Sequence, residues 1–158
     1  MPHGFLLHSR PFRESSVIAA FMTDTDGRID LIVRSARGKQ GKKNKPLLPF
    51  CLYDMSWVGG GDLKNLQSYE TIAAPIALQG QQLFCGLYLN ELLYHLLPAL
   101  EADLVLMRAY SEALWQLSEQ NPLEPILRIF EVTLLEKLGY GIDFFRDASG
   151  VVLDPERF

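Results

Sequence analysis

Six cationic side chains in the twelve residues 34–45, with no acidic residue among them, are the strongest chemical signal in the sequence. Two glycines and the lack of apolar periodicity predict a loop rather than a helix face. Such a loop can follow a phosphate backbone, since each contact releases condensed counterions. The alternative is a solvated surface loop without a ligand. Arg10 and Arg13, in the first predicted loop, would supplement these cations. The cations of residues 34–45, called the basic loop, are Arg34, Arg37, Lys39, Lys42, Lys43 and Lys45.

Patterns typical of catalytic or metal sites are missing from the sequence. His3, His8 and His95 are scattered without metal-ligand spacing, and His95 is expected to be a core or interface residue of an apolar segment. Residues 24–27 (DTDG) resemble the start of a calcium loop but lack its later acidic ligands, so they predict a hairpin turn. Residues 59–61 (GGG) lack the Lys-Ser/Thr of a phosphate cradle. We therefore expect no enzyme, no metal and no cofactor.

Three aromatic residues in the N-terminal half, Phe12, Tyr53 and Trp57, could stack on nucleic-acid bases. Each of them could instead fill the core, and this second role is favoured because aromatic rings bury large apolar areas. The sequence leaves both roles open.

The charge of the chain is divided unevenly along its length. Residues 1–45 hold nine Lys or Arg and four acidic residues, whereas residues 46–158 hold six and fifteen. The net charge of −4 therefore combines a cationic N-terminal part with an acidic remainder. Without a signal peptide or an apolar stretch of about 20 residues, a soluble cytoplasmic protein without a membrane partner is expected. Cys51 and Cys85 are expected to be small buried hydrophobic residues.

The basic loop must be positioned by the N-terminal half, which reads as five short strands joined by Gly/Asp turns. One of them alternates clearly, with Ile29, Leu31 and Val33 on a single face. Five such strands in about 70 residues predict a small closed barrel, OB-type first and SH3-like as the alternative. The strands are expected at residues 4–9, 15–23, 28–34, 50–58 and 63–72.

The remainder of the chain reads as three helices, at residues 83–97, 103–119 and 125–138. The first is apolar nearly all round, which is typical of a helix buried between neighbours. Asp103 is placed to cap the second helix, and Gly139 stands where the third should end. The expected class is α+β, with an OB-fold domain at residues 1–75 and a small all-α helical domain at residues 76–158.

Several strings in this order resemble the RecO family of recombination mediators. Residues 7–16 (LHSRPFRESS) resemble its opening strand and loop, and Gly27-Arg28 followed by residues 34–38 (RSARG) resembles its entry to the basic loop. The more specific strings are residues 86–93 (GLYLNELL) and 130–141 (FEVTLLEKLGYG), and residues 48–50 (LPF) also match. Together they extend over most of the chain.

The resemblance implies a non-catalytic mediator of DNA repair and homologous recombination, localised in the nucleoid. RecO proteins have an N-terminal OB-fold, bind single- and double-stranded DNA and anneal complementary strands. With their partner RecR they help the RecA recombinase to displace single-stranded-DNA-binding protein. The barrel and the basic loop inferred from the residues fit such a DNA-binding role.

The resemblance also implies a partner site in the helical half. The family's helical domain receives the acidic, aromatic C-terminal tail of single-stranded-DNA-binding protein. Arg128 occupies the family's basic position in Leu-Arg-x-Phe-Glu, so we expect it to pair with the terminal carboxylate while Leu127 or neighbouring apolar groups receive the aromatic ring. The alternative is an ordinary solvated helix arginine.

The sequence departs from the family pattern in two respects. Some relatives carry zinc-binding cysteines after the Gly-Tyr-Gly motif, but residues 146–150 (RDASG) contain none, so no zinc is expected. The family also continues for several more helices, so the helical domain is expected to be either a truncated form or one that has lost this part in its lineage. In both cases an exposed apolar face that favours self-association is expected.

Two other functions compete with a DNA-binding mediator. One is a non-catalytic protein-interaction module in which the OB barrel is vestigial. The other is a hydrolase that uses scattered histidine and glutamate residues, which the lack of any nucleophile–base motif disfavours.

Overall fold

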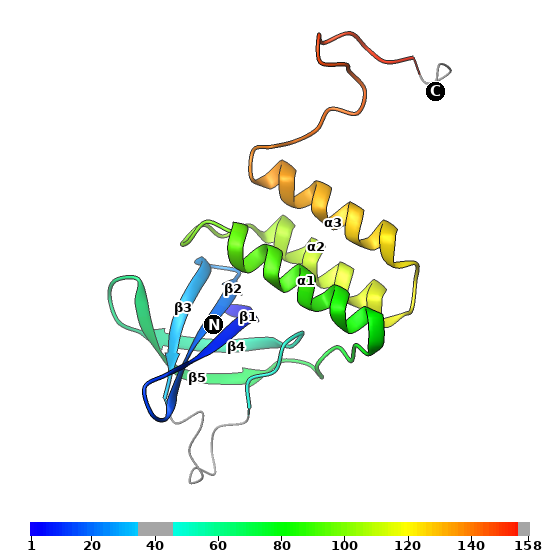
Figure 1. The fold of residues 1–158 in the computed structure, drawn as a ribbon. Helices are drawn as coiled ribbons and strands as arrows, with labels where there is room; N and C mark the ends of the chain where they lie inside the picture. Colours follow the sequence, from blue (N-terminus) through cyan, green and yellow to red (C-terminus); the bar gives the residue numbers. More distant parts are fainter. Residues whose placement is uncertain (35–45, 155–158) are drawn as a thin grey trace.

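The computed structural model describes residues 1–34 and 46–154 of the chain, and all structural statements below concern these residues. Five strands come first in the chain and three helices follow, as Figure 1 shows. This order confirms the expected α+β class. The elements are β1 (His3–Phe12), β2 (Ser16–Thr23), β3 (Gly27–Val33), β4 (Leu52–Val58), β5 (Leu63–Thr71), α1 (Gly80–Leu96), α2 (Leu104–Ser118) and α3 (Leu123–Lys137).

The strands close into a barrel in the order β1-β2-β3-β5-β4. Strands β3 and β5 run parallel, whereas the other neighbours, including β1 and β4 that close the barrel, run antiparallel. A register shift between Leu6 and His8 bends β1, as β-bulges do in strongly curved sheets. This five-stranded arrangement confirms the OB-type barrel.

The barrel interior is filled by the inward side chains of alternating strand positions. In β3 the side chains of Ile29, Leu31 and Val33 are buried, as the alternation in the sequence predicts. Tyr53 is 1% exposed, and burial raises the pKa of its phenol to about 12. Its hydroxyl donates to the carbonyl of Leu48 (3.2 Å) and accepts from the amide of the same residue (2.7 Å). Tyr53 therefore belongs to the core and offers no stacking platform.

A second core joins the outer face of the barrel to the helices. Phe5 of β1 and Met22 of β2 lie opposite each other on that outer face. The ring of Phe5 packs edge-on against Tyr110 of α2, with 5.1 Å between the ring centres. Helix α1 lies across β1, with α2 and α3 beyond it (Figure 1). This second core therefore joins side chains of the barrel's outer face to those of the helices, separately from the barrel interior.

Strand β1 is longer than the sequence indicated, because Arg10-Pro11 does not end it. Pro11 lies opposite Val17 of β2 and the strand continues to Phe12. On its other side β1 pairs with β4 only at His3, Gly4 and Phe5. Pro11 therefore stands on a free edge, where its missing N–H costs no ladder hydrogen bond.

The expectation that α1 is buried on all sides is wrong. One face, containing Leu89, Asn90 and Leu93, is buried, whereas the side chain of Phe84 is 72% exposed. Leu87 and Leu96 are also exposed, at 44% and 45%. His95 is exposed rather than a core residue. The sequence shows the apolar composition of α1, but the packing partners along its length decide which face is covered.

The other helix boundaries follow the local signals. Asp103 caps α2 by accepting from the amide of Leu106 (3.0 Å), and it pairs with Lys137 at the end of α3 (3.2 Å). Burial alone would raise the pKa of Asp103, but the Leu106 hydrogen bond and the Lys137 ammonium outweigh it and lower the pKa. Gly139 follows α3 with φ +85°, the left-handed conformation of a helix C-terminus.

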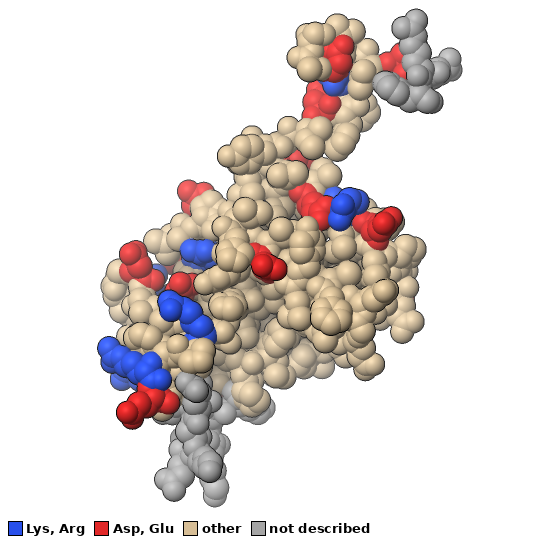
Figure 2. All heavy atoms as spheres, in the orientation of Figure 1, with Lys and Arg blue, Asp and Glu red and all other residues tan. Residues whose placement is uncertain are grey.

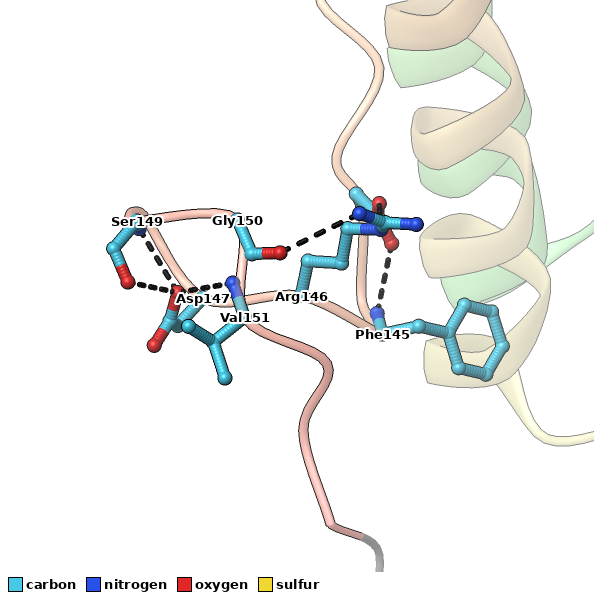
Figure 3. A network of polar contacts seen from close by, with 7 residues as sticks. Phe145, Arg146, Asp147, Ser149, Gly150 and Val151 are labelled. Carbon is cyan, nitrogen blue, oxygen red and sulfur yellow. Dashed lines mark hydrogen bonds and ion pairs between the residues drawn. The ribbon is translucent and has the colours of Figure 1, made fainter.

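The segment after α3 extends away from the helices and contains a small turn (Figures 1 and 3). The carboxylate of Asp147 accepts from the amide and hydroxyl of Ser149 (2.9 and 2.6 Å) and from the amide of Val151 (2.9 Å). Residues 146 and 152 form an isolated antiparallel bridge that closes the turn. In the described residues, no three His, Cys, Asp or Glu side chains lie close enough to hold a metal ion.

Two further findings concern the described part of the chain. None of its helices combines the length and the apolar character that crossing a bilayer requires. Both cysteines are free thiols: Cys51 is buried inside the barrel, and Cys85 is half-buried against the core of the helices.

Candidate nucleic-acid interface

Strand register brings three of the predicted arginines to the same end of the barrel. Phe12 lies opposite Ser16 in the β1–β2 hairpin, and Val17 lies opposite Val33 at the end of β3. Arg10 and Arg13 of the hairpin and Arg34, directly after β3, therefore form what we call the cationic end. Figure 2 shows Lys and Arg side chains gathered at this end, at the lower left of the molecule.

The hairpin presents one cation on a strand and one in its turn: Arg10, expected in a loop, lies in β1 opposite Ile18, and Arg13 lies in the turn. Arg10 and Arg13 are both exposed, and Glu14 of the same turn is the only acidic residue between them and β2. Arg13 adopts φ 55°, and its guanidinium lies over the ring of Phe12, 5.0 Å from the ring centre. The half-buried Phe12 ring thus supports Arg13 rather than standing free for a base. Trp57 is also half-buried and packs against the barrel interior.

Most of the basic loop lies outside the described residues. The structure describes Arg34, the first residue of the loop, and describes the chain again from Pro46. The return point is anchored, because the backbone of Leu48 bonds through both its amide and its carbonyl to the buried hydroxyl of Tyr53. The predicted contact residues Arg37, Lys39, Lys42, Lys43 and Lys45 lie outside the described residues.

The cationic end has the features of a phosphate-contacting surface. Its side chains lie at the β1–β2 and β3–β4 connections of an OB-type barrel, and inter-strand loops frame the binding face in such barrels. Exposed guanidinium groups bind phosphate oxygens in a bidentate manner, without regard to base sequence. The geometry therefore favours a backbone-contacting site over a site that reads particular bases.

One cation of the N-terminal half has a structural role that sequence reasoning missed. Arg28, at the start of β3 and therefore at the opposite end of this strand from Arg34, reaches α1, where its Nη1 donates to the carbonyl of Tyr94 (2.6 Å). Its carbonyl accepts from the amide of Leu100 (3.2 Å), and neighbouring Gly27 lies directly against Glu101. Gly27-Arg28 therefore fixes the barrel to the α1–α2 connection. In the sequence, a glycine followed by an arginine at a predicted turn gives no local signal that the two residues contact a distant helix connection.

Leu127 and Arg128, the two residues proposed to bind a partner tail, lie in different surroundings. On α3, Arg128 is exposed and pairs with Glu131 through Nε (2.9 Å) and Nη2 (3.1 Å). Glu131 also accepts from the hydroxyl of Tyr88 on α1 (2.7 Å). Leu127 instead packs against the core of the helices. A ligand carboxylate that binds Arg128 must therefore displace the carboxylate of Glu131.

A groove of about 440 Å³ lies between α2 and α3. Its walls are largely apolar, with Ala113, Ile126 and Phe130 among them, and Ile129, 69% exposed, stands at the rim. Neither Leu127 nor Arg128 lines it. Ile129, the residue after Arg128, therefore lines the apolar groove, whereas Leu127, the residue before Arg128, does not.

Within the helical half, the amide of Asn90 is buried and accepts a short hydrogen bond from the hydroxyl of Tyr110. Tyr110→Phe removes the only donor that the structure gives to this amide, so we expect a loss of about 1–3 kcal/mol in the free energy of unfolding. Urea unfolding followed by circular dichroism measures it. The double variant Tyr110→Phe with Asn90→Leu should lose less than the two single variants added together, and full additivity would contradict the interpretation.

Comparison with known proteins places these features in a family. A family model described as "Recombination protein O N terminal" matches residues 2–75, and one described as "Recombination protein O C terminal" matches residues 78–158. The first covers the barrel and the second covers the helices and the segment after them.

Curated relatives extend this agreement over nearly the whole chain. "DNA repair protein RecO" of Pseudomonas paraeruginosa is 42% identical over 152 residues, which are 96% of this chain and 64% of the relative. The proteins of the same name from Stutzerimonas stutzeri and Methylococcus capsulatus are also 42% identical, over 98% and 99% of this chain and 64% and 65% of theirs. The chain thus spans just under two thirds of the length of these relatives. With both family models matched in order on an OB-type barrel and its helices, the chain belongs to the RecO family.

Proposed function

We propose that this chain binds DNA through the cationic end and the basic loop, as part of a non-catalytic mediator of DNA repair. The observation that carries the proposal is the position of Arg10, Arg13 and Arg34 at one end of a closed OB-type barrel, where the twelve-residue acid-free loop begins. Contacts of this kind are made to phosphates, so both single- and double-stranded DNA are proposed ligands.

The wider activity rests on the family relationship. The relatives are named DNA repair proteins, and the resemblance to recombination mediators implies annealing of complementary strands. It also implies action with RecR to load RecA onto DNA covered by single-stranded-DNA-binding protein, in the nucleoid. Because no nucleophile–base pattern or metal pattern supports a reaction, annealing should proceed without a nucleotide or a divalent metal ion.

The tail of single-stranded-DNA-binding protein is the proposed ligand of the helical half. Arg128 would exchange the carboxylate of Glu131 for the terminal carboxylate of the tail, a swap between partners of the same charge. The apolar groove between α2 and α3 supports this site, because it could receive the aromatic side chain of the tail. Ile129, next to Arg128, stands at the rim of this groove, and Leu127 does not line it.

A protein-interaction module with a vestigial barrel is the second candidate function. It is favoured by the exposed apolar side chains of the helices, including Phe84, Trp115 and Ile129 at 72%, 56% and 69%. Such a module would bind no DNA, so one DNA-binding experiment distinguishes the two candidate functions.

The experiment is binding of a fluorescent single-stranded oligonucleotide across a salt series. Wild type is compared with a variant in which Lys39, Lys42, Lys43 and Lys45 are all changed to Glu. If all four contact phosphates, the slope of log affinity against log salt should fall by about 3, since each phosphate contact on a single strand contributes about 0.7.

A control tests whether charge alone matters in the loop. A variant with residues 38–45 in shuffled order keeps the composition and should bind like wild type, because phosphate contacts do not read sequence. Equal binding by wild type and the four-glutamate variant would remove the loop from the DNA site. Absence of binding in both would leave the interaction module as the function.

A further inference from the structure

A cleft of about 430 Å³ lies between the outer face of β1 and helix α1, away from the α2–α3 groove. Leu7 and His8 of β1 line one side, and Leu87 and Tyr94 of α1 line the other. Its volume is in the range of sites that bind small molecules or single rings. No function discussed above uses it.

An aromatic pair within the cleft lining joins its two sides, His8 from β1 and Tyr94 from α1. The rings of His8 and Tyr94 lie 4.6 Å apart between centres at an angle of 34°, which is a tilted stack. On the Tyr94 ring the guanidinium of Arg28 adds a further contact, 5.7 Å from the ring centre. These contacts hold the two rings in place across the boundary between barrel and helix. Pre-positioned histidine and tyrosine rings are the side chains on which unpaired bases stack.

A buried amide with an unsatisfied donor also lines the cleft. Asn90 is 3% exposed, and its oxygen is occupied by the hydroxyl of Tyr110. Its Nδ2 has no hydrogen-bond partner in the described part of the chain. A buried amide hydrogen without an acceptor is unfavourable, so an acceptor atom supplied by a ligand would be stabilised there.

The charges at the cleft favour a neutral ligand group. Glu91 is the only acidic residue among the described lining residues, His95 lines the cleft as well as His8, and neither lysine nor arginine lines it. Without a lysine or arginine the cleft lacks the usual phosphate ligands, whereas it can accept a ring that carries hydrogen-bonding groups but no charge. Cations begin just outside: Arg10 follows His8 on the outer face of β1, about 7 Å further along the strand.

We propose that this cleft receives one base of a single-stranded nucleic acid whose phosphates contact Arg10 and the cationic end. The base stacks on the His8–Tyr94 pair, offers an acceptor to the Asn90 amide and lies over Leu87. The proposal rests on the proposed DNA binding and adds to it a site for a base, where the cationic end alone provides only phosphate contacts.

The test compares binding of two oligonucleotides of equal length and charge, one of thymidines and one of abasic residues. Wild type should bind the thymidine strand about tenfold more tightly, which lies within the range that a single stacked base contributes. Leu87→Trp fills the cleft with a larger side chain and should reduce this preference to nearly one. Leu96→Trp is the matched control, since Leu96 lies on the same helix at 45% exposure against 44% for Leu87, and does not line the cleft.

A second measurement locates the base directly. Irradiation of wild type with an oligonucleotide containing 5-iododeoxyuridine, followed by peptide mapping, should place the crosslink on His8 or Tyr94. Leu87→Trp should lose this crosslink and Leu96→Trp should keep it. Thermal unfolding by circular dichroism verifies that both variants are folded, so the comparison does not depend on a destabilised protein.

The outcomes separate this proposal from the proposed function. Equal, salt-sensitive binding of both strands by wild type would retain phosphate binding and overturn the base site. Binding of neither strand would overturn both. If Leu87→Trp keeps the preference for bases and instead weakens binding of an acidic peptide that ends in phenylalanine, the cleft is a peptide site and the proposal is wrong.

Discussion

Gly27→Ala is expected to lower the free energy of unfolding by roughly 3–5 kcal/mol. An added Cβ would stand 2.1 Å from the carbonyl oxygen and 2.4 Å from the carbonyl carbon of Glu101, which are backbone atoms. The residue also has φ +63°, a conformation that costs alanine about 1 kcal/mol by itself. To relieve the clash, the α1–α2 connection must move away from the barrel and lose the hydrogen bond from Leu100 to Arg28.

Gly61→Ala separates the two contributions to this loss. Gly61 has φ +85°, and nothing lies within 4 Å of an added Cβ, so only the conformational cost of about 1 kcal/mol applies. Both variants are measured by urea unfolding monitored by circular dichroism. Equal losses for Gly27→Ala and Gly61→Ala would show that the contact with Glu101 does not hold the barrel to the helices.

The double variant Arg10→Glu with Arg13→Glu should reduce affinity for single-stranded DNA at least tenfold at low salt. Removing two phosphate contacts should lower the slope of log affinity against log salt by about 1.4. Both arginines are exposed in the β1–β2 hairpin, so the effect on folding should be small. The reversed charges also repel the backbone, which adds to the lost attraction. Fluorescence anisotropy at several salt concentrations measures both quantities.

The matched control reverses Arg108 and Arg128 in place of Arg10 and Arg13. Both control residues are exposed on helices, and the change in net charge is the same. If binding depends on the cationic end, the control should lose little affinity, because its charges lie on α2 and α3 and not on the barrel. Comparable losses in the two variants would mean that overall charge, not this end of the barrel, determines binding.

The element order was predictable from the sequence because its signals are local. Alternation of Ile29, Leu31 and Val33 defines a strand face within a few residues, and Asp103 and Gly139 mark helix ends through hydrogen bonds and backbone conformation next to them. The strand count, three helices and an OB-type closure follow from such signals. The first strand, expected at residues 4–9, extends through Pro11 to Phe12, because the effect of a proline depends on whether a neighbouring strand needs its N–H, and that neighbour is distant in the sequence.

Only the tertiary structure decided which side chains meet. Arg28 and Arg34 are equivalent cations in the sequence, yet pairing of β2 with β3 leaves Arg34 at the cationic end and turns Arg28 toward Tyr94, 66 residues away. The contact between His8 and Tyr94, and the groove boundary at Ile129 rather than Leu127, depend on the same long-range packing. Periodicity and capping are properties of neighbouring residues, whereas a site is formed by residues that strand register and helix packing bring together.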